Sequence, residues 1–427
     1  MIRILQISDI HFLSGEAEED PNVLMRQRLF DDIDDLVKTK GEIDTILVCG
    51  DIAAKAQEEE YDNAFAVLKE LAQHCGCSLD DVCVVPGNHD VNWNEHNTSR
   101  NLVMEHLFDK TRADKTINSW KREEPLAIHL LHAPFMNYVR KICIPCNCVE
   151  GISERCMMGE MNFKGLKLYW RRKIGVESGR DVIVYGMNTA LISSSNDLDF
   201  QNNTKGQAMF LPQIAYNVVG KSNEILVSMM HHPTPYIMDG DKIKRELDQR
   251  FKVQFFGHVH IQSSDNTDNI KIFSGALQPE KVEENKGYIP VYNFLELSVK
   301  EDNSCNSELC IDLYSRKWDG SRFVQLCEQE AERLTTSLTH SSSWEKNTGN
   351  EDKTNLDDVV PTPAATMKSV SEISYIFLNM RDVKKVINNI YPDSYNRLMP
   401  DMKNRLLFLQ RVKRDNKYKE LEEQISK

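Results

Sequence analysis

Five short polar stretches, each placed directly after a run of apolar residues, constrain this chain more than any other feature. They are Asp9-Ile10-His11, Gly50-Asp51, Gly87-Asn88-His89-Asp90, His231-His232 and Gly257-His258-Val259-His260. The preceding runs are short and rich in strand-forming residues, which is typical of a buried strand that ends in a polar loop. Carboxylates, imidazoles and an amide oxygen that recur in this way predict one site assembled from five distant parts of the chain.

The first ninety residues alternate between strand and helix patterns. Strands are predicted over residues 1–7, 45–49 and 82–85, with two amphipathic helices between them, the first ending before Gly41. Strands separated by helices run parallel and are joined by right-handed crossovers. Sheets of this kind bind ligands outside the carboxyl ends of their strands. The side chains expected on that rim are Asp9, His11, Asp51 and Asn88.

The remaining residues divide the chain into a large domain, a linker and a small module. Within the predicted domain, residues 1–330, the stretch from about 91 to 180 breaks the alternation and predicts a helical insertion that covers the rim. Residues 331–369 are rich in Ser, Thr, Asn and acidic residues without apolar periodicity, so a disordered linker is expected. Residues 370–427 carry helical patterns and predict a small all-α module near the lower size limit for independent folding.

The composition excludes several classes of protein. A net charge of -13 argues against binding to nucleic acid through a strongly basic surface. No apolar run approaches the roughly 20 residues needed to span a bilayer, so no membrane association is expected. The first strand pattern leaves no room for a cleaved signal, and the eleven cysteines are then interpreted as reduced thiols. A cytoplasmic location is expected.

The residue types of the five stretches favour divalent metal ions. Hard metals that catalyse phosphate hydrolysis prefer a mixture of carboxylate, imidazole, amide oxygen and water ligands. Seven protein ligands are too many for one ion that must leave positions open, but they suit two ions about 3.5–4 Å apart with a shared carboxylate. Mn²⁺ or Fe is favoured, and Zn²⁺ and Ni²⁺ are compatible. The seven candidates are Asp9, His11, Asp51, Asn88, His231, His258 and His260.

The five motifs, in this order, are similar to those of the calcineurin-like metallophosphoesterase superfamily. The resemblance covers roughly the first 300 residues and implies an α/β fold, a four-layer αββα sandwich, here followed by the small all-α module. It implies one ion held by Asp9, His11, Asp51 and His260, and a second held by Asp51, Asn88, His231 and His258. It also implies that His89 contacts the phosphate or protonates the leaving oxygen, with Asp90 orienting it.

The motifs also narrow the branch of the superfamily. Protein Ser/Thr phosphatases carry an Arg shortly after Gly-Asp and a Glu after Gly-Asn-His, whereas this chain has Gly50-Asp51-Ile52-Ala53 and Asp90. The motif style looks more like that of bacterial cyclic-nucleotide phosphodiesterases, although DNA-repair nucleases share the core motifs. The predicted function is two-metal hydrolysis of a phosphodiester, in a nucleotide or a nucleic acid, by a metal-activated water.

The alternative function is a DNA or RNA nuclease effector that a protein partner recruits or regulates through residues 370–427. A linker followed by a small helical module loosely resembles the adaptor arrangement of bacterial conflict and signalling proteins. A protein partner for residues 370–427 is therefore one expectation, beside a phosphodiester substrate for the site.

Several side chains have two interpretations. Only one of His231 and His232 needs to bind metal, and the family preference for a ligand two residues before proline favours His231. His232 then contacts the substrate or is structural. Asn188 follows a predicted strand and could reach the substrate, although an amide that stabilises its loop is favoured. Four cysteines lack the paired spacing of a structural zinc site and are interpreted as unpaired thiols: Cys143, Cys146, Cys148 and Cys156.

Overall fold

The computed structural model divides the chain into two compact units, Met1–Ser342 and Ser343–Lys427. The described residues of the first unit are 1–14, 22–93, 135, 168–194, 197, 208–267, 269–278, 289–301, 307–327 and 330–338. Those of the second unit are 384–392, 411–412, 415 and 417–425. Most of the predicted insertion and linker, together with the four cysteines from Cys143 to Cys156, lie outside the described residues.

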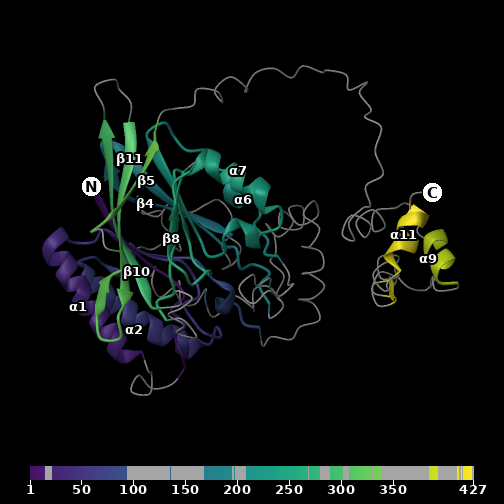
Figure 1. The fold of residues 1–427 in the computed structure, drawn as a ribbon, viewed down its shortest axis with the longest axis horizontal. Helices are drawn as coiled ribbons and strands as arrows, with labels where there is room; N and C mark the ends of the chain where they lie inside the picture. Colours follow the sequence, from purple (N-terminus) through teal and green to yellow (C-terminus); the bar gives the residue numbers. More distant parts are fainter. Residues whose placement is uncertain are drawn as a thin grey trace, which may run out of the picture. The chain divides into compact units, whose positions relative to one another are not determined.

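The first sheet is built on three parallel strands with two helices between them, as predicted. Figure 1 shows these two helices, α1 and α2, beside the sheet. Its strand order is β12-β11-β10-β1-β2-β3, and β13 also pairs with β11. The parallel strands are β1 (Ile2–Ile7), β2 (Thr45–Val48) and β3 (Val82–Val84). The antiparallel strands are β10 (Val291–Glu301), β11 (Ser307–Trp318), β12 (Phe323–Gln325) and β13 (Glu332–Ser337).

The second sheet has the order β4-β5-β6-β7-β9-β8. Its central strands β5 (Arg180–Met187), β6 (Glu224–Met230), β7 (Val253–Phe256) and β9 (Ile270–Phe273) are parallel. Its edge strands β4 (Tyr169–Glu177) and β8 (Ser263–Asp265) are antiparallel to their neighbours.

Four α-helices of the first unit are described, together with three short 3-10 helices. The α-helices are α1 (Val23–Lys40), α2 (Glu58–Cys75), α6 (Gln213–Tyr216) and α7 (Gly240–Arg250). The 3-10 helices are η2 (Leu79–Asp81), η3 (Asn88–Asp90) and η5 (Thr234–Tyr236). Gly41 ends α1 as predicted, with its N–H bonded to Val37 O.

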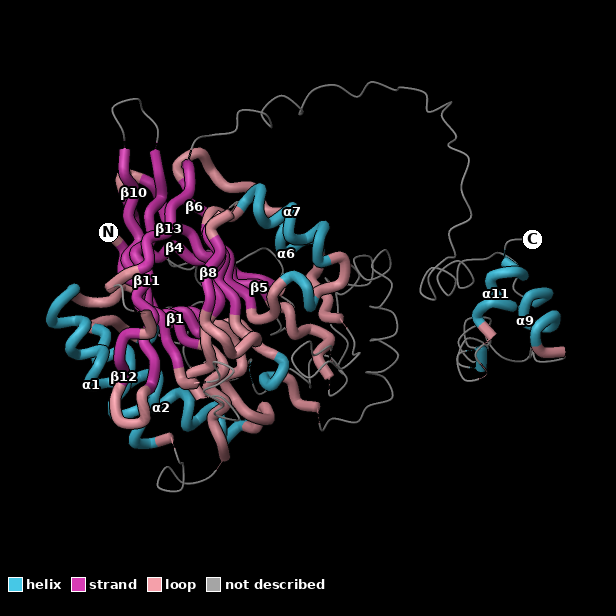
Figure 2. The backbone as a smooth tube through the Cα atoms, in the orientation of Figure 1, coloured by secondary structure: helices cyan, strands magenta, loops and turns pink. Residues whose placement is uncertain are grey.

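Strand side chains alternate between two faces, and this alternation builds the layers. In β2, Ile46 and Val48 pack into the cluster that contains α1 and α2, whereas Leu47 packs with β5, β6 and β7 of the other sheet. The outer face of the second sheet is covered by α6 and α7, with Ile243 and Leu247 in their shared cluster. The predicted αββα sandwich is therefore confirmed, and the tube in Figure 2 shows strands layered between helices.

Two predicted boundaries are corrected by strands at the edges of the sheets. β4 lies inside the stretch of about 91–180 that predicted an insertion, yet it pairs with β5 from Tyr169 to Glu177, with one register shift between Lys173 and Gly175. β13 lies inside the predicted linker that began at residue 331, yet it pairs with β11. Both are edge strands with charged or polar residues and no fully apolar face, so neither shows the pattern of a buried strand.

The described part of the second unit contains two helices, α9 (Lys384–Ile390) and α11 (Tyr418–Ile425). Ile387 and Leu421 are buried, and the hydroxyl of Tyr391 donates to Asp415 Oδ2 at 2.8 Å. The partner predicted for residues 370–427 has no support among these residues and stays a prediction. None of the described helices is both long and apolar enough to cross a membrane.

Trp170 ties the edge of the second sheet to the strand that leads into the Gly87-Asn88-His89-Asp90 stretch. Its indole Nε1 donates to Val84 O in β3 at 3.0 Å. The ring lies across Gly186, its register partner in β5, so closely that a Cβ there would fall 2.1 Å from Trp170 Cε2. Only glycine leaves room for this crossing.

Gly186→Ala is expected to lower the free energy of unfolding by about 1–3 kcal/mol, because the added methyl displaces a packed indole ring. The measurement is the urea midpoint of the full chain followed by circular dichroism. Val176→Ala is the control, since this side chain of the neighbouring strand is 52% exposed and its loss should cost less than about 0.5 kcal/mol. Equal midpoints for the two variants would contradict the assigned contact.

Candidate metal centre

The five polar stretches meet at one edge of the sandwich because each follows the carboxyl end of a parallel strand. Asp9 and His11 follow β1, Asp51 follows β2, Asn88 follows β3, His231 follows β6, and His258 and His260 follow β7. The loops also bond to one another: Asp9 N donates to Gly50 O at 3.0 Å, and His258 N donates to Asp9 Oδ2 at 3.1 Å. The structure therefore brings all seven predicted ligands together from both sheets.

The ligand atoms form overlapping groups around two carboxylates. Asp9, His11 and His260 have donor atoms within 4.8 Å of one another, and Asp9 Oδ1 lies 3.1 Å from His260 Nε2. Asp51 belongs to two further groups, one with His11 and His89 and one with Asp9 and His231. Asp51 thus lies between the side of the cluster that holds His260 and the side that holds His231.

The amide of Asn88 lies on the second side of this cluster. Its Oδ1 is 3.0 Å from His231 Nε2 and 3.1 Å from His258 Nδ1. The imidazoles of His258 and His260 therefore reach different partners although they are only two residues apart. An extended segment would point both side chains the same way, but here both residues have a positive φ, 70° and 58°, which turns the backbone between them.

Positive φ is concentrated at this site. Of the eight non-glycine residues with positive φ in the described part of the chain, five are candidate ligands. Such a conformation costs roughly 1–2 kcal/mol per residue in an L-amino acid, so the surrounding structure must hold it. The five are Asp9, His11, Asp51, His258 and His260. Strain of this kind is typical of sites where side chains are aimed at a ligand.

Gly87 is required because the backbone passes directly against Asp51. A Cβ at Gly87 would lie 2.1 Å from Asp51 Oδ1 and 2.4 Å from Asp51 N. The close approach lets His89 N donate to the same oxygen at 2.8 Å. Any larger residue would push the loop that carries Asn88 and His89 away from the carboxylate.

The surroundings of His231 show that this cluster favours a positive charge. Its Nδ1 lies 2.8 Å from Cys49 O, a carbonyl that only accepts, so Nδ1 carries the ring proton. The remaining lone pair on Nε2 then faces the oxygens of Asn88, at 3.0 Å, and of Asp51, at 3.2 Å. Burial opposes a charge on His231, but Asp51 outweighs it and raises the pKa to about 9.

Two carboxylates and two imidazoles of the cluster have the charges that a metal site requires, whereas Asp9 raises the pKa of His260 against the effect of burial. Burial would raise the pKa of Asp9, but the neighbouring His260 lowers it to about 2. Burial would also raise the pKa of Asp51, but the neighbouring His231 lowers it well below its usual value. Burial lowers the pKa of His11 to about 4 and that of His258 to about 3, so both rings are neutral at pH 7. Neither ring nitrogen of His11 meets a hydrogen-bond partner among the described residues. Anionic carboxylates beside neutral imidazoles fit divalent cations.

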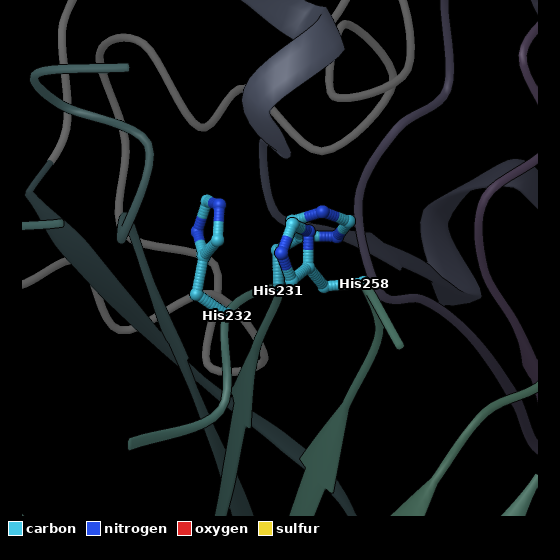
Figure 3. Close-up of side chains that lie close together, drawn as sticks. All are labelled: His231, His232 and His258. Atoms are coloured by element: carbon cyan, nitrogen blue, oxygen red, sulfur yellow. The ribbon is translucent and has the colours of Figure 1, made fainter. Parts of the chain in front are cut away.

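His232 lies beside the second side of the cluster, and Figure 3 shows its ring standing next to those of His231 and His258. Its backbone N donates to Thr189 Oγ1 at 3.2 Å, and the same hydroxyl lies 2.9 Å from its Nδ1. Its Nε2 is buried and has no hydrogen-bond partner among the residues that the structure describes. His231, not His232, is the histidine that contacts Asn88 and Asp51.

The imidazole of His89 is oriented by a backbone carbonyl. Nδ1 donates to Ala54 O at 2.9 Å, so the proton of a neutral ring is on Nδ1 and Nε2 is left for chemistry. The ring packs edge-on against His11, with the centroids 4.7 Å apart. His89 therefore lies over the side of the cluster that holds His11 and Asp51.

Asp90 holds the loops of the site through hydrogen bonds to residues other than His89, and its role in orienting His89 stays a prediction. Its carboxylate accepts from Gly87 N, Ile52 N and Ala53 N at 2.9–3.1 Å, and from the hydroxyl of Tyr61 at 2.9 Å. Burial, followed by the charge of Asp51, raises its pKa to about 6. Asp90 is thus a positioning residue that joins the loops after β2 and β3 to α2.

Asn188 matches the favoured interpretation of a loop-stabilising amide. It follows β5 and is buried, and its Oδ1 accepts from Ala190 N at 3.0 Å. Three important groups were missed by sequence reasoning: the Tyr61 hydroxyl, the Thr189 hydroxyl and the Ala54 carbonyl. Tyr61 resembled an ordinary core residue of α2, and nothing in a helical period reports where a hydroxyl points.

The Asp90 contacts predict that two variants lose stability to different extents. Asp90→Asn places an amide N–H₂ against two of its four donors and should cost about 2 kcal/mol or more, because those donors lose their acceptor. Tyr61→Phe removes one hydrogen bond and should cost about 1 kcal/mol. Urea unfolding of the chelator-treated protein measures both. Wild-type stability in Asp90→Asn would rule out this network.

Comparison with known proteins agrees with the site. The model of the calcineurin-like phosphoesterase family matches residues 2–262. An uncharacterized metallophosphoesterase-like protein of Bacillus subtilis strain 168, YydB, is 23% identical over 292 residues, 65% of this chain and 53% of that protein. The chain thus spans about half the length of this curated relative.

Solved structures also match, with low scores. A Vps29 single mutant from Entamoeba histolytica is 12% identical, with 79% of this chain and all of that chain covered and a TM-score of 0.30. A conserved uncharacterized protein of Streptococcus pneumoniae, described as a predicted phosphoesterase, is 10% identical over 78% of this chain and 98% of that chain, with a TM-score of 0.26.

The family assignment rests on the family model and on the site. Members generally use a dinuclear divalent metal centre, and the candidate ligands for one converge here. The chain belongs to the calcineurin-like phosphoesterase family.

Proposed function

We propose that this chain is a two-metal phosphodiesterase that acts on a nucleotide or a nucleic acid. The observation that carries the proposal is the position of Asp51, a buried carboxylate shared by ligand groups on both sides of the cluster. One ion would be held by Asp9, His11, Asp51 and His260, and the other by Asp51, Asn88, His231 and His258. Bound there, two divalent ions supply an activated water and neutralise charge on the phosphoryl oxygens.

His89 is the proposed catalytic residue among the protein side chains. Ala54 O keeps the proton of the neutral ring on Nδ1 and so presents Nε2 to the substrate. When Nε2 is protonated, it can donate to a phosphoryl oxygen or give its proton to the leaving oxygen. The Asp51 carboxylate also holds His89 in place, because its Oδ1 accepts a hydrogen bond from the backbone N–H of His89.

His232 is proposed as a substrate contact. Its ring is buried beside His258, with centroids 4.6 Å apart, and Thr189 occupies its Nδ1 side. Burial, reinforced by the neighbouring His258, lowers the pKa of His232 well below its usual value, so the ring is neutral. With the Thr189 hydroxyl donating to Nδ1, Nε2 carries the proton and is a donor for a phosphoryl oxygen.

For the metals and the substrate, the proposal names classes. Mn²⁺ and Fe are favoured, with Zn²⁺ and Ni²⁺ as alternatives, because all accept these carboxylate and imidazole ligands. A panel of cyclic nucleotides, nucleoside monophosphates, single-stranded DNA and plasmid, each with Mn²⁺ and with chelator, distinguishes a nucleotide phosphodiesterase from a nuclease. Chelator should abolish every activity that belongs to the site.

Asp51→Asn and His89→Ala should separate metal binding from chemistry. Asp51→Asn should lose most of both ions, because the shared ligand loses its charge, and with them hydrolysis of bis-p-nitrophenyl phosphate. His89→Ala should keep both ions and lose about 10²–10⁴-fold in kcat, the usual range for a proton-transferring group. Elemental analysis of the purified variants gives the metal content. Full metal and full turnover in Asp51→Asn would overturn the scheme.

His231→Ala and His232→Ala should differ in the same assays. His231→Ala should reduce the bound metal by about one ion per chain, since Nε2 faces Asn88 and Asp51. His232→Ala should keep both ions and lower kcat/KM by about 10-fold or more. Thr189→Val, which keeps the volume and removes the hydroxyl, should show a smaller loss of the same kind. Loss of one ion in His232→Ala would make His232 a ligand instead.

A further inference from the structure

Trp93 lies beside the proposed catalytic histidine and has no role in the scheme above. It follows Asp90 by three residues. The centroids of its indole ring and of the His89 imidazole are 5.2 Å apart, and the two ring planes are tilted by 43°. Val91, between them, is buried and anchors this segment. Trp93 itself is half-buried and packs against the core beneath α1 and α2. Its ring is thus held in place at the edge of the metal cluster.

The indole N–H of Trp93 is buried without a hydrogen-bond partner among the described residues. A buried donor without an acceptor costs free energy, and a Phe or Leu would fill the same space without that cost. Buried tryptophans usually satisfy this N–H, so an unsatisfied one next to a catalytic group indicates an acceptor that arrives with the ligand.

Two exposed apolar residues lie close in the sequence to other site histidines. Leu13, two residues after His11, is 45% exposed, and Ile261, directly after His260, is 39% exposed. The amide of Asn63 donates to Leu13 O at 2.9 Å, which holds that part of the loop. Two of the six large hydrophobic side chains exposed in the described part of the chain therefore lie within two residues of a candidate ligand in the sequence. Ligand sites commonly combine such apolar surface with a few polar groups.

We infer that Trp93 contacts the organic group that leaves from the phosphorus atom, and that this group is planar, as in a nucleoside or aryl ester. The inference rests on the proposed function. His89 is placed to protonate the leaving oxygen, so the carbon skeleton attached to that oxygen lies on the side where Trp93 stands. The indole face packs on the planar group, and the indole N–H, which lies in the plane of the ring, donates to an oxygen bound to phosphorus.

The test compares two diesters in the metal-loaded full chain: bis-p-nitrophenyl phosphate, with a planar leaving group, and glycerophosphoethanolamine, with aliphatic groups. Trp93→Phe keeps the ring and loses the N–H, so kcat/KM should fall about 5-fold on both esters, the effect of one neutral hydrogen bond. Trp93→Leu should lower kcat/KM by roughly a further 10-fold on the planar ester only, because stacking on an aromatic ring is lost.

Two readouts separate substrate contact from a packing role. Metal content should equal that of the wild type in both variants, and thermal stability of Trp93→Phe should be unchanged or higher, since a buried unpaired donor is removed. Trp318→Phe is the matched control, because its ring packs on Phe323 in the first sheet, 5.5 Å away. An unchanged ratio of the two esters in Trp93→Leu, or unchanged kcat/KM in Trp93→Phe, would overturn the inference.

A binding measurement keeps the inference testable apart from the proposed function. If the wild type hydrolyses neither ester, the proposed function fails. Indole fluorescence of the Zn²⁺-loaded protein is therefore titrated with AMP, whose base should quench Trp93. The quench should disappear in Trp93→Phe and persist in Trp318→Phe. A wild type without quenching, or a quench that survives in Trp93→Phe, counts against Trp93 as the contact.

Discussion

The site depends on one buried negative charge, the carboxylate of Asp51. Burial of an isolated carboxylate is costly, so the surrounding structure must supply donors and positive charge. Here the backbone N–H of His89 and the ring of His231 meet its two oxygens, and Gly87 passes close enough to make the first of these contacts possible. The positive φ of Asp51, 51°, shows that this arrangement is imposed on the residue by the fold.

A second buried carboxylate, Asp90, contrasts with Asp51 in its partners. Four donors from three segments of the chain converge on Asp90, and none of them is a candidate metal ligand. Burial raises its pKa, whereas histidines lower that of Asp51. The same residue type therefore serves as an anchor for the loops at one position and as a centre of charge at the other, because the neighbours differ.

The sequence predicted the interior of the fold better than its edges. β1, β2 and β3 are apolar on both faces because each is covered by helices on one side and by the other sheet on the opposite side, so their pattern is plain. β4 was missed because its charges are paired with neighbours: Arg171 with Glu224 and Lys173 with Asp181. A charged edge strand looks like a surface segment until its partners are known.

The sequence by itself determined the types and order of the candidate ligands and their place after strands, because parallel strands deliver their carboxyl ends to one rim. Only the tertiary structure decided which atoms meet: that His231 and not His232 faces Asn88, that Ala54 O orients His89, and that Asp90 binds backbone N–H groups and Tyr61. It also placed the ring of Trp93, whose N–H has no hydrogen-bond partner among the described residues, beside that of His89. The physical reason is that these contacts join residues far apart in the chain, or depend on backbone turns with positive φ, and neither leaves a periodic pattern in the sequence.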